Sequence, residues 1–481
     1  MYRRVCVTNN FTSGLVLGVG RLVAGITRAQ NKMSRLLPIA AAVTLQTALC
    51  LAPVQANAAI GLAPAHGFAP HQLVVKRADA RTARTVRLPR GVGVRAAAAA
   101  LRRRPGVEYA APNYIATASA TKSAATIGLP NDPGTIALPI GPPGGWVTKQ
   151  WNFLPWEGTA TPLLPISPGG INAVGAWENL AAAGRPGAEG VIVAVLDTGI
   201  AYRSKGSRFL RSPDFSAGQF VPGYDFVDND PIPLDENGHG THVAGTIAEK
   251  TNNGIGLTGL AYRAKLMPIR VLDKHGRGQA DEIAKGIRFA VNHGADVINM
   301  SFNFECGKQV PGVDEALRQA YRRGVVTVAS VGNLGSEACV APPATSPHTI
   351  GVGGSTEGGC LGDYSLAGAD VDVLAPGGGE PVTGCPSISS SPIYQVTLKN
   401  HNPRFFAEPS DYIGTSMAAA HVSGVAAMIL ASGTLDPQAK KRGRVLAVTK
   451  RLQGTARSLG LPATRQGAGL IDAAAATSPS S

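Results

Sequence analysis

Three segments in the second half of the chain are almost wholly apolar, and segments with helical spacing of apolar residues lie between them. The apolar runs are GVIVAVLDTGI (190–200), ADVINMSF (295–302) and GVVTVASVGN (324–333). The helical patterns cover 239–249, 280–293 and 312–323. A strand that is buried on both faces has such a continuous run, because neither face is left for polar residues. This alternation predicts an α/β domain built on a parallel sheet with helices on both faces.

The N-terminal part of the chain has a different pattern. HQLVVK, GVRAAAAALRRR and VEYAAPNYIA predict a strand, a helix and a second strand, which together form a small α+β module within 71–118. The segment 118–149 is rich in Ser, Thr, Gly and Pro and has no apolar period, so we expect a linker. The expected division is 1–58, 59–118, 119–149 and 150–481.

The first 58 residues resemble an export signal that begins at an internal start. From Met33 the chain has a positive charge at Arg35, then an apolar stretch, then Ala56-Asn57-Ala58, which has the form of a cleavage signal. Residues 1–32 would then be an upstream extension. A membrane anchor is the alternative, although the apolar core is short for one. We expect a secreted protein with no membrane attachment after processing.

Charge is distributed very unevenly. The chain has a formal net charge of +14, and residues 1–118 hold 16 Lys and Arg against two acidic residues. The remainder holds 29 basic and 29 acidic residues and is therefore neutral. Removal of the N-terminal part would leave a protein without the excess of positive charge that binding to nucleic acid requires. We therefore expect no nucleic-acid partner.

Four of the six cysteines follow the N-terminal region: Cys306, Cys339, Cys360 and Cys385. An even number in an exported chain predicts two disulfides. Of the three possible connectivities we favour the sequential pairs, 306–339 and 360–385. A zinc site is the alternative, but the cysteines have no C-x-x-C spacing.

Polar residues of three kinds stand where strands end or helices begin. Asp197 ends an apolar run, His239 lies in NGHGTHVAGT (237–246), and Ser416 lies in DYIGTSMAAAHVSG (411–424). A serine hydroxyl becomes a nucleophile when an imidazole takes its proton, and a buried carboxylate orients that imidazole. Asn333, at another strand end, could donate to an oxyanion. Taken singly, each residue could equally be a turn, core or helix-capping residue.

Taken together, VAVLDTGI, NGHGTHVAGT and GTSMAAAHVSGVAA resemble the active-site motifs of the subtilisin-like serine peptidases, in that family's order. VINMSF, VTVASVGN and GAGLIDAAAA match further motifs, and the resemblance covers about 150–478. It implies a serine endopeptidase without an organic cofactor, acting on proteins or peptides. In this resemblance Asp197 orients, His239 is the general base and Ser416 the nucleophile, while Asn333 stabilises the oxyanion.

The segment 59–118 is similar to the inhibitory pro-segment of that family. The resemblance implies that this segment templates folding and then blocks the active site until it is removed. The sequence LPNDP (129–133) resembles a mature N-terminus, so cleavage is expected between about 118 and 130. The mature enzyme is expected to be a monomer.

Two loops resemble the family's calcium sites. In YDFVDNDPIPLDENGHG (224–240) the expected ligands are Asp225, Asp228 and Asp230, although Ile232 and Leu234 stand at later ligand positions. A solvated acidic turn is the alternative. In the second loop, TNNGIGL (251–257), Asn253 and the carbonyl of Ile255 would act with Asp214 and Gln150.

The chain departs from the family pattern in three places. Asn303 and Phe304 replace two glycines beside the pocket for the substrate side chain, which predicts a preference for smaller residues at the cut. Ala420 replaces a proline, so we expect a more regular helix start and slower hydrolysis relative to acyl transfer. The insertion 382–411 either lines the cleft or is a surface loop.

Two other classes of function remain open. A catalytically impaired relative could act as a binding protein. Alternatively, the basic N-terminal part could be a binding module attached to an unrelated α/β domain.

Overall fold

The structure is a computed structural model that describes residues 68–80, 83–114, 129–135, 144–158, 164–335, 339–387, 389–436 and 441–479. The expected start at Met33, the export signal and most of the expected cleavage region lie outside these residues. The chain divides into two compact units, Met1–Ala118 and Ser119–Ser481.

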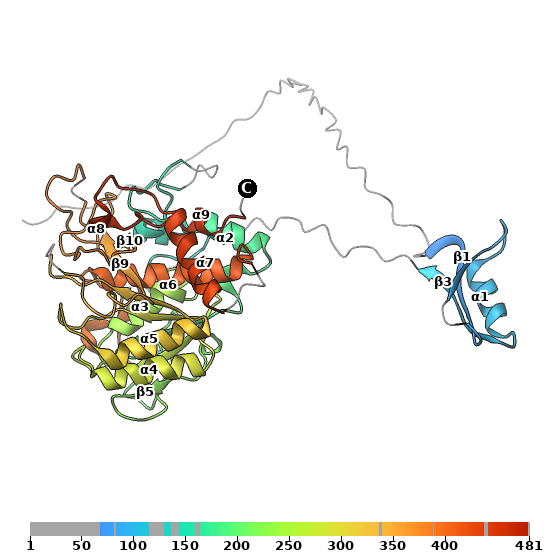
Figure 1. The fold of residues 1–481 in the computed structure, drawn as a ribbon, viewed down its shortest axis with the longest axis horizontal. Helices are drawn as coiled ribbons and strands as arrows, with labels where there is room; N and C mark the ends of the chain where they lie inside the picture. Colours follow the sequence, from blue (N-terminus) through green and yellow to red (C-terminus); the bar gives the residue numbers. More distant parts are fainter. Residues whose placement is uncertain are drawn as a thin grey trace, which may run out of the picture. The chain divides into compact units, whose positions relative to one another are not determined.

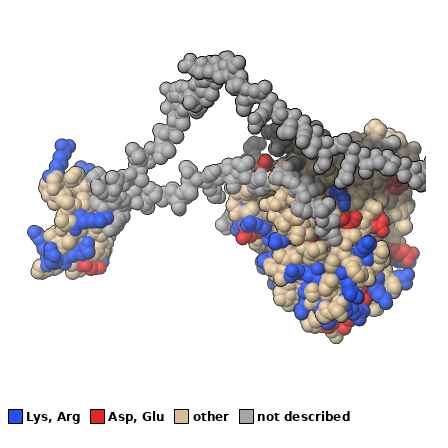
Figure 2. Space-filling view, turned by 180° about the vertical axis from the view of Figure 1, so that it is seen from behind, with Lys and Arg blue, Asp and Glu red and all other residues tan. Residues whose placement is uncertain are grey.

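The smaller unit is an antiparallel sheet with one helix. Its elements are β1 (Phe68–Arg77), β2 (Arg84–Arg87), α1 (Val94–Arg102) and β3 (Val107–Tyr114), and the strand order is β2-β1-β3. Leu73, Val94 and Ala98 form its buried core. Lys and Arg side chains gather on its visible face (Figure 2). The sequence did not predict β2, because all four of its residues are exposed and two are arginines.

The larger unit contains a seven-stranded sheet in the order β10-β9-β8-β7-β4-β6-β5. Every neighbouring pair of its strands is parallel. The strands are β4 (Ile192–Asp197), β5 (Tyr224–Asp225), β6 (Lys265–Arg270), β7 (Val297–Met300), β8 (Val326–Ser330), β9 (Ile350–Ser355) and β10 (Val373–Pro376). The long helices are α2 (Ala173–Ala182), α3 (His239–Ala248), α4 (Ala280–Asn292), α5 (Pro311–Arg323), α6 (Thr415–Ser432) and α7 (Lys441–Gly454). The short ones are α8 (Ala463–Gln466) and α9 (Ala473–Thr477).

Helices cover both faces of this sheet. The Asn299 side chain of β7 meets Ser423 of α6, whereas Leu196, which pairs with Met300, lies against Gly286 of α4. Since successive residues of a strand point to opposite faces, α6 and α4 lie on opposite sides. Helices α4 and α5 run side by side (Figure 1). The predicted parallel sheet with helices on both faces is therefore confirmed.

Helix α6 is the core helix of this unit. It is the one helix in the described part of the chain that is long and apolar enough to cross a membrane, with a mean hydropathy of 1.4. However, 94% of that stretch is buried inside the protein. The helix is continuous through Ala420, in agreement with the expected regular start.

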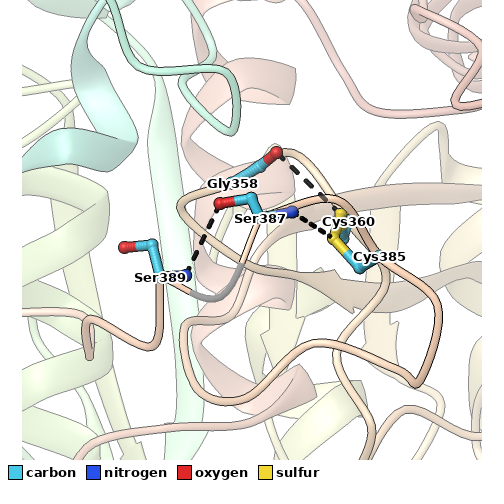
Figure 3. The surroundings of a disulfide bond; sticks show 5 residues. All are labelled: Gly358, Cys360, Cys385, Ser387 and Ser389. Carbon is cyan, nitrogen blue, oxygen red and sulfur yellow. Dashed lines mark hydrogen bonds between the residues drawn. A yellow bond between two sulfur atoms is a disulfide. The ribbon is translucent and has the colours of Figure 1, made fainter.

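Two disulfides join Cys306 to Cys339 and Cys360 to Cys385, with Cα–Cα distances of 6.0 and 6.2 Å. The sequential pairing is confirmed, and these cysteines are not available to zinc. The second disulfide ties the loop after β9 to the start of the insertion 382–411, and the Ser387 amide donates to Cys385 Sγ beside it (Figure 3).

Candidate active site

The end of β4 and the start of α3 bring Asp197 and His239 together. His239 Nδ1 lies 2.8 Å from Asp197 Oδ1, and the same oxygen accepts from the Thr198 amide. Asp197 is fully buried, whereas the His239 side chain is 26% exposed. The imidazole is therefore held from the protein side and open on the other, as a base that must reach a substrate requires.

Asp235 shapes the turn that presents His239, and the sequence analysis did not single it out. Its buried carboxylate accepts five hydrogen bonds, from the Thr198 hydroxyl, the amides of Asn237, Gly238 and Thr241, and the Thr241 hydroxyl. The signal available in the sequence was a carboxylate three residues before the GHGTH segment, which begins at Gly238. This carboxylate lies in the segment 224–240, which resembles a calcium loop, and it was therefore given no separate role.

Burial and charge act in opposite directions on His239. Burial lowers its pKa, but the charge and hydrogen bond of Asp197, with a further contribution from Asp235, leave the pKa above its ordinary value. His242, one turn later, is different. It is fully buried, stacks on Tyr412 with ring centroids 4.0 Å apart, and burial lowers its pKa to about 3. His242 is thus a neutral core residue.

Ser416 is the second residue of α6, and only glycine suits the position before this helix. Gly414 has a φ of 142°, and a Cβ there would lie 2.9 Å from Asn333 Nδ2. Ser416 is 9% exposed. Its Oγ donates to the Ser301 carbonyl at 3.1 Å, and the described structure contains no hydrogen bond between Ser416 and His239. Productive alignment therefore requires rotation of the Ser416 side chain.

A buried polar chain fixes the backbone around Ser416. The Ser423 hydroxyl donates to Asn299 Oδ1, and Asn299 Nδ2 donates to Ser301 Oγ. Ser301 Oγ in turn donates to the Ser416 carbonyl at 2.8 Å. Consequently β7 holds both the first and the third turn of α6, which limits movement of the serine. The Ser416 carbonyl is also the one to which the Ala420 amide can donate as residue i+4 of the helix.

Asn333 lies beside the same helix start. Its Oδ1 accepts from both the amide and the hydroxyl of Thr415, each at 2.8 Å. Since its oxygen is anchored, the exposed side chain has its Nδ2 left to donate. The structure thus brings Asn333 next to Ser416.

Asn303 spans the ends of two neighbouring strands. Its Nδ2 donates to the Ser330 carbonyl at 2.6 Å, and the Ser330 hydroxyl donates to Asn303 Oδ1 at 3.1 Å. The side chain is therefore held in place beside the strand ends, where the family resemblance expects open space.

The first predicted calcium loop does not fit a cation in this structure. Arg270 donates from one guanidinium nitrogen to Asp225 at 2.8 Å and to Asp228 at 2.6 Å. The other Asp225 oxygen accepts from the amides of Val227 and Asp228, and Asp230 accepts from the Ile232 amide. Arg270 is 6% exposed, so a positive charge of the protein itself already stands among these carboxylates.

The second predicted calcium loop lies against three buried carboxylates, Asp132, Asp214 and Glu249, here called the acid cluster. All three are fully buried, and burial raises the pKa of each. The charge of Asp214 raises the pKa of Glu249 further, and neither side-chain oxygen of Glu249 has a hydrogen-bond partner in the described structure. No ion pair joins these carboxylates to a Lys, Arg or His of the described residues.

The predicted ligands surround the acid cluster. Asn253 Nδ2 donates to Asp214, while Asn253 Oδ1 accepts from the Ile255 amide. Gln150 Nε2 donates to the Thr258 carbonyl, and Gln150 Oε1 accepts from the Thr258 amide. Among the described residues no three His, Cys, Asp or Glu side chains converge closely enough to hold a metal ion, so a cation here would also need amide and carbonyl oxygens. Uncompensated buried negative charge fits a hard cation. The sequence analysis missed Asp132 and Glu249.

Comparison with known proteins adds independent information. Residues 188–469 match the model of the subtilase family, and residues 69–113 match that of the fervidolysin N-terminal prodomain. A thermophilic serine proteinase of Bacillus sp. (strain AK1) is 32% identical over 71% of this chain and 67% of its own length. Thermitase of Thermoactinomyces vulgaris is 37% identical over 51% of this chain and 76% of its own length.

A solved structure of proteases from Pseudoalteromonas arctica PAMC 21717 is also similar. It has 30% identity and a TM-score of 0.55 and is covered over 98% of its length, with 73% of this chain aligned. The family match spans more than half of the chain and includes both partners of the Asp197–His239 contact. The chain therefore belongs to the subtilase family of serine proteases and carries an N-terminal prodomain of the fervidolysin type.

Proposed function

We propose that Asp197, His239, Ser416 and Asn333 carry out peptide-bond hydrolysis through an acyl-enzyme. The observation that supports this most strongly is the 2.8 Å contact between buried Asp197 and partly exposed His239 at the start of α3. Asp197 fixes which imidazole nitrogen carries the proton, so Nε2 is free to act as a base.

In the proposed reaction Ser416 Oγ leaves the Ser301 carbonyl, turns toward His239 and attacks the scissile carbonyl carbon. His239 takes the hydroxyl proton and then gives it to the leaving amine. Asn333 Nδ2 donates to the oxyanion, because Asn333 Oδ1 is already bonded to the amide and hydroxyl of Thr415. A water molecule then releases the acyl group by the same steps.

The prodomain is proposed to act as an intramolecular inhibitor that the enzyme removes itself, between about 118 and 130, after export directed by the leader from Met33. The mature protease would be a secreted monomer. Intact prodomain in a Ser416→Ala variant, with cleaved prodomain in the parent, would support autoprocessing. N-terminal sequencing of the secreted protein locates the cut.

We also propose a structural calcium ion beside the acid cluster. Asp214, Asn253, Gln150 and the Ile255 carbonyl would hold it, and Asp132 and Glu249 would add negative charge. Calcium prefers oxygen ligands of this kind, and its charge would offset the carboxylates that the fold buries. Its role is to stabilise the loop, and no catalytic step depends on it.

The experiment that tests the proposed function is hydrolysis of an unstructured protein substrate, with mass spectrometry of the fragments. Internal cleavage that is lost in Ser416→Ala supports an endopeptidase. Binding of the same substrate without cleavage by the processed parent would instead indicate an impaired relative that acts as a binding protein.

A further inference from the structure

An open surface cavity of about 860 Å³ lies next to the His239 turn and is lined with basic side chains. Its lining contains Arg208, Lys274, His275, Arg277, His401 and Arg404, and one acidic residue, Glu236. Arg208 and Glu236 form a pair at 3.6 Å. Lys274, Arg277 and Arg404 have no carboxylate within 4 Å in the described part of the chain. We call this region the basic cavity.

Asn237 connects the basic cavity to the proposed general base. It belongs to the cavity lining, its Oδ1 accepts from the His239 amide at 3.1 Å, and its Nδ2 donates to the Lys274 carbonyl at 2.9 Å. One side chain therefore bonds both the turn that holds His239 and the loop that carries Lys274. A substrate residue bound beside His239 would have its side chain close to this cavity.

The insertion 382–411 supplies the opposite wall. A short ribbon of β11 (Thr397–Leu398) and β12 (Phe406–Ala407) closes the loop that contributes Asn400 to Arg404. The Leu210 amide donates to the Pro403 carbonyl at 2.9 Å, and His401 Nδ1 donates to the Asn237 carbonyl. The insertion is thus anchored to the protein at His401 and Pro403, just before Arg404, and is more than a loose surface loop.

The backbone of this wall has an uncommon conformation. Asn400 and His401 are consecutive residues with φ values of 52° and 56°. Left-handed conformation is unfavourable for a non-glycine residue, and it persists where surrounding contacts enforce it. Here it places His401 against Asn237, at the edge of the basic cavity nearest to His239.

Other charges near the cavity do not neutralise it. Asp273 precedes Lys274, but its carboxylate accepts from the amides of His275 and Arg277. Burial acts to raise the pKa of Asp273, but these hydrogen bonds, with a smaller contribution from nearby positive charge, leave it below its ordinary value. Asp273 therefore stabilises the Lys274 loop. The three unpaired cations remain exposed and available to a ligand.

We infer that the basic cavity is a subsite for an acidic side chain of the substrate, within about two residues of the scissile bond. The inference rests on the proposed function, since it assumes that peptides lie across His239. A carboxylate gains from several cations in a concave site, where the local potential is focused. A single cavity beside the reacting groups suits one side chain, whereas a polyanion needs an extended basic track.

The test uses the mature parent enzyme and paired fluorogenic peptides that differ only by Glu or Gln at each position from P3 to P3′. The readout is the ratio of kcat/KM for the Glu peptide to that for the Gln peptide. We expect a ratio of about ten at one position, falling as salt is added. Lys274→Gln with Arg404→Gln should bring the ratio close to one.

Two further variants sharpen the test. Lys274→Glu should reverse the preference and favour Lys over Gln at that position, a gain that a misfolded protein could not show. Arg318→Gln removes the same charge from an exposed position on α5 outside the cavity, and it should keep the parent's ratio.

A ratio near one at every position in the parent would overturn the inference, as would a preference that survives in the Lys274 and Arg404 variants. Inhibition by double-stranded DNA without any Glu preference would instead identify a polyanion surface. Failure to cleave even the Gln peptides would reject the proposed function, which is a distinguishable outcome.

Discussion

The reaction centre and the acid cluster both bury carboxylates, but they compensate the charge differently. Asp197 is fully buried and faces His239 at 2.8 Å, so in the proposed reaction a proton on the imidazole would provide the counter-charge. Asp214 and Glu249 are equally buried and lie near each other, and neither forms an ion pair with a Lys, Arg or His of the described residues. The loop at Asp225 shows a third solution, in which Arg270 supplies the charge.

Because these regions compensate their buried carboxylates differently, substitutions can change catalysis and stability separately in this protease. A buried carboxylate is tolerated only with a partner, because removal from water disfavours its charged form. At the reaction centre the partner is His239, which titrates, and in the Asp225 loop it is Arg270, which stays charged. The acid cluster needs a cation from solution. Each region should therefore respond to a different perturbation.

The largest expected effect concerns the reaction centre. Ser416→Ala or His239→Ala should lower kcat by about 10⁴-fold or more, because the nucleophile or its base is lost. Ser416→Ala should change the melting temperature by only a few degrees, whereas His239→Ala also removes the partner of buried Asp197 and should lower the melting temperature further. Ser391→Ala, in the insertion, is the control and should keep activity. Peptide hydrolysis and thermal unfolding measure both effects, on variants whose prodomain has been removed by added parent enzyme.

The second effect concerns calcium. At a calcium concentration about 100 times its Kd, the stabilisation should be about 2.7 kcal/mol. This corresponds to a rise of about 4 °C in melting temperature for the unit Ser119–Ser481. Asp214→Asn should abolish most of the rise, whereas Asp225→Asn should retain it. Equal melting temperatures of the parent with calcium and with chelator would contradict a cation at the acid cluster.

Arg270 gives the third effect. Arg270→Gln leaves two carboxylates at the β5–β6 edge without a partner and should lower the free energy of unfolding by about 3 kcal/mol. Urea unfolding measures this change. The double variant Arg270→Gln with Asp225→Asn should recover part of the loss. A loss that calcium fully restores would show that this loop binds a cation after all.

A smaller effect is expected at the strand ends beside Ser416. Asn303→Gly removes a side chain held by Ser330, so larger substrate residues should be accepted. We expect kcat/KM for Phe relative to Ala at the cut to rise about tenfold. Cleavage profiling on a peptide library measures it. A parent enzyme that already prefers Phe or Tyr would refute the role assigned to Asn303.

The smallest expected effect is a shift in the pH dependence of kcat/KM. Protonated His239 cannot accept the serine proton, so activity is lost as the pH falls through its pKa. Because Asp197 and Asp235 raise that pKa above 6.5, the acid limb of kcat/KM should have its midpoint above 6.5. A midpoint below 6.5 would show that burial outweighs both carboxylates.

The sequence predicted the sheet and its covering helices, because strands buried on both faces leave continuous apolar runs. The even number of cysteines predicted two disulfides but left three connectivities open, and the structure shows the sequential one. It placed Asp197 and His239 correctly at a strand end and a helix start. It could not predict that Arg270 occupies the Asp225 loop, since these residues are 45 positions apart and meet only through the β5–β6 pairing. It also missed Glu249. That Glu249 is buried close to Asp214, with no cationic partner among the described residues, becomes visible only in the folded structure.

The acid cluster and Asp235 show the same limit. Asp132 contacts Thr258, 126 residues away, and Asp235 lies in the segment 224–240, where the sequence suggested calcium ligands at Asp225, Asp228 and Asp230 and gave Asp235 no role. Local composition identified charged loops but not the partner of each charge. That partner decides whether a carboxylate binds metal, shapes a turn or orients a histidine.

The most direct test of the central claim is covalent labelling of the processed protein with a serine-directed phosphonate, followed by peptide mapping. We expect one modified residue, Ser416, and a loss of labelling in a folded His239→Ala variant whose prodomain the parent enzyme has removed. Absence of labelling in processed parent protein, or labelling that does not depend on His239, would contradict the proposed catalytic centre.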